Sequence, residues 1–118
     1  MGFFDEDTGE MLGIYLLETN QLLDQSDAIL LSAEQEMVFS KESINGIFRV
    51  MHTIKSSSAM MGLTGLSTLT HRLEDLFVVF REDPSRLSGY EQETFDLIFE
   101  ATDFIREEPK RMKFESFE

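Results

Sequence analysis

Apolar residues recur every three or four positions along nearly the whole chain, and this spacing restricts the fold more than any other feature of the sequence. Residues three and four apart lie on one face of an α-helix, so each such run predicts an amphipathic helix. A half-buried β-strand would instead alternate apolar and polar residues, and no stretch of the chain sustains that alternation. The pattern therefore predicts an all-α protein.

Two helices are expected in the first half of the chain. The first covers about residues 8–32, and it could break near Gly13 or at residues 24–26. The second begins near Ser40 or Ser43, because either hydroxyl can accept a hydrogen bond from the free backbone N–H groups of the first turn. It ends near Gly62. The side chains expected on its buried face are Ile44, Ile47, Phe48, Met51, Ile54 and Ser58.

Two further helices are expected in the second half. The third covers about residues 64–83 with a leucine-rich seam, and Asp83–Pro84 ends it because a residue before proline avoids helical geometry. At the start of the fourth, Ser88 and Glu91 have the spacing of a capping box. In this motif the serine side chain accepts a hydrogen bond from the backbone N–H of the glutamate, and the glutamate side chain accepts one from the backbone N–H of the serine. Pro109 is expected to end this helix. The apolar face of the fourth helix is expected to hold Tyr90, Thr94, Leu97, Ile98, Ala101, Phe104 and Ile105.

Four amphipathic segments with short connections predict an antiparallel four-helix bundle. We expect the bundle to occupy residues 1–109. Residues 110–118 are expected to form either a short helical extension packed on the bundle or the start of a linker. The chain has 118 residues, which fits one domain, and 42% of them are hydrophobic, which is enough for a sizeable core.

Charge and composition exclude several classes of partner. Ten Lys and Arg residues against 23 Asp and Glu residues give a net charge of −13, which repels nucleic acid and anionic lipid. There is no cysteine, so disulfides and thiolate metal sites are excluded. The longest apolar runs are too short for membrane insertion or a signal peptide. We therefore expect a cytoplasmic protein whose partners are other proteins.

His52 lies on the flank of the second predicted helix, among residues that suit chemistry on an anionic group. A helix turns about 100° per residue, which puts His52 roughly 110° from the centre of the apolar stripe. Lys55, Ser56 and Ala59 follow three, four and seven residues later and share its side of the helix. A cation and small side chains beside an accessible imidazole favour a phosphate-carrying site. The alternative is an ordinary solvated surface histidine.

Glu74 is the expected partner of the His52 ring. If the second and third helices form an antiparallel hairpin through Gly62, Glu74 lies level with His52 at the margin of the core. A carboxylate that accepts a hydrogen bond from one ring nitrogen fixes the tautomer and leaves the other nitrogen free as a nucleophile. Lys55 would then stabilise the oxygens of a phosphoryl group by its charge.

The second and third predicted helices resemble those of histidine-containing phosphotransfer (Hpt) domains. In that family a lysine follows the histidine after three residues and a glycine after ten, and here these residues are His52, Lys55 and Gly62. His71 and Glu74 further resemble the subset of the family found at the amino terminus of chemotaxis histidine kinases of the CheA type. The resemblance covers nearly the whole chain at the level of architecture.

This resemblance implies a phosphotransfer module of a two-component phosphorelay. His52 would accept a phosphoryl group from the ATP-binding domain of a histidine kinase and pass it to an aspartate of a response regulator receiver domain. Those partners would supply ATP and Mg²⁺, because the chain has no glycine-rich phosphate loop after a strand, and no cofactor is expected on the chain itself. The chain would be a phosphocarrier, either free-standing or part of a larger kinase.

Ser56 departs from the family pattern, which often has glycine at this position. Serine is still small, so transfer is expected to survive, although its hydroxyl could bond the ring or the phosphoryl group and change the rate. The alternative is a helical interaction or scaffold bundle whose phosphotransfer site has decayed. No metal is expected, because His71 and Glu74 provide too few ligands, and His71 is expected to be a supporting residue near the site.

Overall fold

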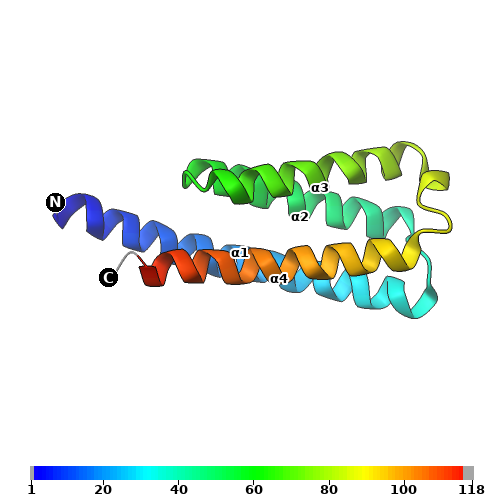
Figure 1. Cartoon of the computed structure of the whole chain (residues 1–118), viewed down its shortest axis with the longest axis horizontal. Coiled ribbons are helices and arrows are strands. Elements are labelled where there is room, and N and C mark those ends of the chain that lie inside the picture. Colours follow the sequence, from blue (N-terminus) through cyan, green and yellow to red (C-terminus); the bar gives the residue numbers. More distant parts are fainter. Residues whose placement is uncertain (1, 116–118) are drawn as a thin grey trace.

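The computed structural model describes the backbone of residues 2–115 and the side chains of residues 9–109. Within residues 2–115 there are four α-helices and no β-strand, and successive helices run in opposite directions, so that the start of α1 and the end of α4 lie at the same end of the molecule (Figure 1). The antiparallel four-helix bundle is therefore confirmed. The helices are α1 (Gly2–Glu36), α2 (Lys41–Met60), α3 (Thr64–Glu82) and α4 (Glu91–Glu115), with a 3₁₀ turn, η1 (Pro84–Arg86), between the last two.

The α2–α3 hairpin has clear signals at both of its turns. Ser40 caps α2, because its Oγ accepts a hydrogen bond of 3.0 Å from the backbone N–H of Ser43. At the other end the N–H of Gly62 donates to the carbonyl of Ala59, and the next N–H donates to the carbonyl of Ser58. Gly62 has a φ of +74°, a left-handed conformation that glycine adopts without steric penalty. Both predicted ends of α2 are confirmed.

All four helices contribute side chains to one core. α2 packs against both α1 and α3, and α1 also packs against α4. Ser58 is fully buried, and its Oγ lies 2.8 Å from Oη of Tyr15, so this serine joins α1 to α2 by a hydrogen bond. Phe39, between α1 and α2, stacks on Phe95 of α4 with ring centroids 4.6 Å apart. The largest fully buried apolar side chains are Phe77, Phe95, Leu23, Leu30, Ile44, Ile47, Met51, Ile54, Ile98 and Ile105.

α1 is longer than the sequence pattern predicted. It covers Gly2–Glu36 rather than about residues 8–32, and it passes through Gly13 without a break. A glycine inside a helix destabilises it by only about 1 kcal/mol, which packing offsets. Ala33 is still buried, so contacts with the core continue beyond the predicted end. The helix ends at Glu36, and the next residue, Met37, takes a left-handed conformation with a φ of +52°.

α4 differs from the prediction at both ends. It begins at Glu91, so Ser88 does not cap it, and the Glu91 carboxylate instead accepts hydrogen bonds of 2.9 and 3.0 Å from the N–H of Gly89. The helix continues through Pro109 to Glu115, so the predicted end at this proline is wrong. A proline inside a helix costs about 3 kcal/mol. Burial of the Pro109 ring offsets part of that cost.

Part of the predicted apolar face of α4 is also wrong. Tyr90, Leu97 and Phe104 are exposed, whereas Phe95 is fully buried. The predicted domain boundary at residue 109 falls inside a continuous helix. The side chains of residues 110–118, which would distinguish a packed extension from a linker, lie outside the described residues. Among the residues that are described, no helix combines the length and the hydropathy that a membrane span needs.

Candidate functional site

His52 and Glu74 meet across the α2–α3 hairpin. His52 lies in the middle of α2, and Glu74 lies midway along α3. Nδ1 of the His52 ring is 2.5 Å from Oε2 of Glu74, so a hydrogen bond joins the two side chains. The contact expected from a hairpin through Gly62 is confirmed.

Lys55 binds the other oxygen of the same carboxylate. Its Nζ donates a hydrogen bond of 2.8 Å to Oε1 of Glu74. Both oxygens of Glu74 are therefore bound by groups from α2. From the sequence, Lys55 was expected beside a phosphoryl group, and this contact with Glu74 was not predicted.

The Glu74 carboxylate is nearly buried, and only 7% of the residue is exposed. Burial by itself raises the pKa of a carboxyl group. Here the hydrogen bonds from Lys55 and His52, together with their charges, outweigh burial and lower the pKa of Glu74 below its ordinary value. Glu74 is therefore negatively charged at neutral pH and can only accept hydrogen bonds.

The charge on Glu74 determines which nitrogen of His52 carries the proton. Because the carboxylate only accepts, Nδ1 must donate, and Nε2 of the neutral ring keeps a free electron pair. The side chain of His52 is 57% exposed, whereas that of Glu74 is 10% exposed. A partner can therefore reach the imidazole while its orienting carboxylate stays buried, which is the arrangement of an activated nitrogen nucleophile.

Two further residues lie around the ring, and neither of them was predicted from the sequence to belong to the site. Phe48, one turn earlier on α2, stacks on His52 with ring centroids 6.1 Å apart and an interplanar angle of 19°. The guanidinium carbon of Arg81, on α3, lies 4.4 Å from the centroid of the Phe48 ring. The available signal was the spacing of four residues between Phe48 and His52, which makes them neighbours on a helix.

The small residues near His52 lie as the helix geometry predicts. Ser56 and Ala59 are exposed, one and two turns beyond the histidine. Oγ of Ser56 donates a hydrogen bond of 3.1 Å to the backbone carbonyl of His52, a common bond for serine inside a helix. The hydroxyl is therefore engaged with the backbone rather than with the ring. Gly62 serves the hairpin turn, ten residues after His52.

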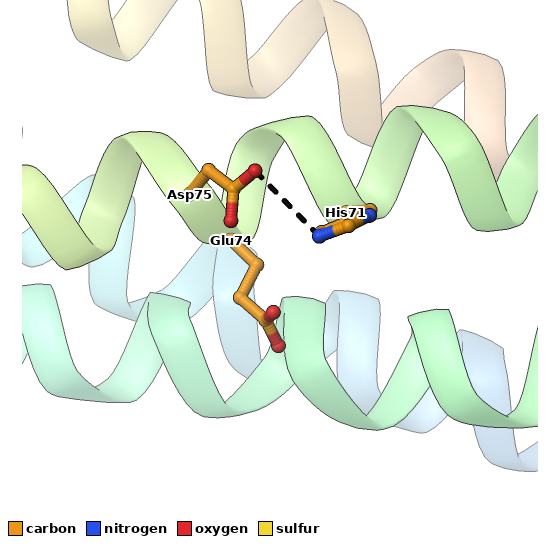
Figure 2. A group of neighbouring side chains, drawn as sticks. All are labelled: His71, Glu74 and Asp75. Atoms are coloured by element: carbon orange, nitrogen blue, oxygen red, sulfur yellow. Dashed lines mark ion pairs between the residues drawn. The ribbon is translucent and has the colours of Figure 1, made fainter.

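His71 lies near Glu74 but forms its ion pair with Asp75. Its Nε2 is 3.6 Å from Oδ2 of Asp75, and Figure 2 shows Glu74 pointing away from these two side chains toward the neighbouring helix. His71, Glu74 and Asp75 each have one potential ligand atom within 4.8 Å of the others. Because His52 and Lys55 already bind both oxygens of Glu74, the three residues do not form a preorganised metal site.

Comparison with known proteins relates these features to one family. The Hpt domain family matches residues 10–104. The chain is 32% identical to the chemotaxis protein CheA of Borreliella burgdorferi, over 91% of this chain and 12% of that protein. It is 30% identical to CheA of Bacillus subtilis, over 84% of this chain and 14% of that protein. It is 29% identical to the sensor histidine kinase CheAY of Helicobacter pylori, over 86% of this chain and 12% of that protein. No solved structure matches the chain significantly.

The matches agree with the architecture and with the position of the candidate site. The chain spans about an eighth of the length of the curated relatives it matches. The family match includes α2 and α3 entirely, and with them His52, Lys55 and Glu74. The chain is a four-helix bundle that matches the Hpt domain family over most of its length. It therefore belongs to this family, the histidine phosphotransfer modules of two-component signalling.

Proposed function

We propose that His52 is the phospho-accepting residue of this Hpt domain. The observation that supports it best is the hydrogen bond from Nδ1 of the exposed His52 ring to the buried Glu74, because it leaves Nε2 with a free electron pair. The other histidine of the chain, His71, pairs instead with Asp75, a carboxylate that is itself exposed.

The transfer consists of two displacements at phosphorus. Nε2 of His52 attacks the γ-phosphorus of ATP held by a histidine kinase ATP-binding domain. The Nε2–P bond forms, the bond from the γ-phosphorus to the bridging oxygen breaks, and ADP leaves. A carboxylate oxygen of a receiver aspartate then attacks the same phosphorus, and the Nε2–P bond breaks. Such reactions depend mostly on positioning and on neutralisation of charge, for which the partner domains supply Mg²⁺.

Glu74 and Lys55 have separate tasks in this scheme. Glu74 holds the ring and stabilises the positive charge that develops on it as the Nε2–P bond forms. Lys55 holds the Glu74 carboxylate in the resting protein. It lies one turn from His52, where its charge also favours a phosphoryl group on the ring.

The relatives indicate the setting in which this module works. They are chemotaxis proteins and a sensor histidine kinase, and this chain corresponds to a small part of each. We infer that the donor is a kinase ATP-binding domain, that the acceptor is a receiver domain, and that transfer takes place in the cytoplasm, where ATP is available. A scaffold bundle with a decayed site is not favoured, because His52, Lys55 and Glu74 are all present and linked by hydrogen bonds.

Incubation with a histidine kinase and labelled ATP tests the proposal. We expect acid-labile, base-stable label on the wild-type chain and none on His52→Gln. His71→Gln is the matched control, because it removes the other imidazole of the chain, and its label should equal that of the wild type. Label that persists in His52→Gln, or a wild-type chain that takes no label from any cognate kinase, contradicts the proposal.

A further inference from the structure

The hydrogen bond to Glu74 holds one atom of the His52 ring but does not determine the plane of the ring. The ring is also attached to the backbone through Cβ, but small coupled changes of χ1 and χ2 that keep this hydrogen bond still tilt the ring and displace Nε2. Misplacement of a reacting atom by about 1 Å is enough to slow a well-oriented reaction substantially. A second contact, on the face of the ring, would remove this freedom.

Phe48 provides a contact on the face of the ring. The two rings are nearly parallel, at 19°, and their centroids are 6.1 Å apart, which is the geometry of an offset stack. Phe48 and His52 are four residues apart on α2, so the helix itself brings the rings together. Phe48 is half-buried and packs against the core, so the bundle holds it in place.

Arg81 contacts the Phe48 ring from the opposite helix. Its guanidinium carbon lies 4.4 Å from the ring centroid, well within the range of about 6 Å for a cation–π interaction. Within residues 9–109, no ion pair competes for this guanidinium. Arg81 follows Glu74 by seven residues, which puts both on the same face of α3, two turns apart.

We propose that Phe48 and Arg81 are positioning residues for the phospho-accepting histidine. α3 then acts on the His52 ring at two points: Glu74 holds Nδ1, and Arg81 holds the plane of the ring through Phe48. Phe48 and Arg81 act through the ring and not on the phosphoryl group. This inference rests on the proposed function of His52 and adds a second layer of orientation to it.

Reaction with phosphoramidate tests the inference, because this small donor needs no docking surface. Nε2 attacks the phosphorus, the Nε2–P bond forms, the P–N bond of the donor breaks, and ammonia leaves. We expect Arg81→Met to slow formation of phosphohistidine by about two- to fivefold and Phe48→Leu by about two- to tenfold. Phe48→Tyr keeps an aromatic ring and should retain the wild-type rate.

Arg72→Met is the matched control for Arg81→Met. Arg72 is an exposed arginine on the same helix, so its replacement removes the same charge. We expect Arg72→Met to leave the rate and the NMR resonances of the His52 ring protons unchanged. Arg81→Met should shift those resonances, because the Phe48 ring above His52 is no longer held. The Nδ1–H tautomer should persist in both variants, since Glu74 is untouched.

The outcomes separate this inference from the function on which it rests. If the wild-type chain is phosphorylated while Arg81→Met and Phe48→Leu react at the same rate with unshifted His52 resonances, the positioning role is wrong and the function stands. If Arg81→Met is slower with no shift of those resonances, Arg81 acts on the donor directly, which also overturns positioning. A wild-type chain that takes no phosphoryl group on His52 from phosphoramidate or from a cognate histidine kinase overturns the proposed function and this inference together.

Discussion

Glu74 is a nearly buried carboxylate whose two oxygens bind two different side chains of the neighbouring helix. His52 and Lys55 lie three residues apart on α2, and Glu74 makes them parts of one unit. Without this carboxylate nothing would select the Nδ1–H tautomer of the imidazole, and the ammonium of Lys55 would lose its hydrogen-bond partner. The properties of the site at the residue scale therefore depend most on Glu74.

Glu74→Gln is expected to slow phosphorylation of His52 by about ten- to a hundredfold, the loss found when a carboxylate that orients a metal-binding histidine is removed. Glutamine has the same size, but its amide neither selects the Nδ1–H tautomer nor stabilises positive charge on the ring. The rate of labelling by a histidine kinase measures the effect. Asp75→Asn is the control, since Asp75 is an exposed carboxylate on the same helix. Equal losses in both variants would contradict a specific role for Glu74.

The lowered pKa of Glu74 also predicts how stability depends on pH. A carboxyl group whose pKa is lower in the folded than in the unfolded protein stabilises the fold at any pH above its pKa in the unfolded protein. For Glu74 that unfolded pKa is about 4.5. That contribution is lost as the pH falls through the lower, folded value. Wild type should therefore exceed Glu74→Gln in free energy of unfolding at neutral pH, and the difference should shrink as the pH falls below about 4.5. Urea unfolding of both proteins measures it, and a difference that grows on acidification would contradict the account.

The sequence located His52, Lys55 and Glu74 because helix geometry brings them together. A spacing of three on one helix puts Lys55 beside His52, and an antiparallel hairpin through a glycine brings Glu74 level with the histidine, although the bond between Lys55 and Glu74 was not predicted. Arg81 could not be located in the same way. Its contact with Phe48 depends on the side-chain rotamers and on the register of α3 against α2, and periodicity reports neither.

At the scale of elements, Gly62 determines how α3 follows α2. Its φ of +74° costs an L-residue about 1–2 kcal/mol. Gly62→Ala is therefore expected to lower the free energy of unfolding by about 1 kcal/mol. Gly65→Ala is the matched control: Gly65 lies in the first turn of α3, where an added Cβ meets nothing within 4 Å and alanine favours the helix. Urea unfolding should show a loss for the first variant only, and equal stability of Gly62→Ala and wild type would contradict this reading of the turn.

The ends of the helices show where local signals suffice and where packing decides. Both ends of α2 were predicted, because Ser40 and Gly62 are capping residues whose chemistry acts locally. The end of α1 was placed too early, since Met37 takes the left-handed position that glycine usually marks. The end of α4 was placed at Pro109, but the helix continues through this residue, whose ring is buried. Burial against other elements is not visible in a local pattern.

At the scale of the whole molecule, periodicity was enough to predict the bundle, and the charge distribution adds a property of its own. The chain carries a net charge of −13, and its first forty residues contain no Lys or Arg. Arg106 of α4 forms ion pairs with two carboxylates of this acidic segment on α1. Its Nη2 lies 3.0 Å from Oδ1 of Asp24 and 2.7 Å from Oδ2 of Asp27. Self-repulsion of the excess negative charge destabilises the compact state.

Salt should therefore stabilise the folded protein. Ions shorten the range of repulsion to about 10 Å at 0.1 M and about 3 Å at 1 M, so the melting temperature should rise with NaCl concentration. Arg106→Met removes a cation that pairs with Asp24 and Asp27 of α1, and its melting temperature should rise more steeply with salt than that of the wild type. Thermal unfolding followed by circular dichroism measures both. A melting temperature that falls as salt is added would mean that ion pairs outweigh repulsion in this bundle.

The central claim is that Nε2 of His52 carries the phosphoryl group while Glu74 keeps the proton on Nδ1. NMR of the phosphorylated full chain, labelled with ¹⁵N-histidine, tests it most directly. We predict coupling between phosphorus and Nε2 of His52, with Nδ1 still protonated. Phosphorus on Nδ1 of His52, or on any other residue, would contradict the account.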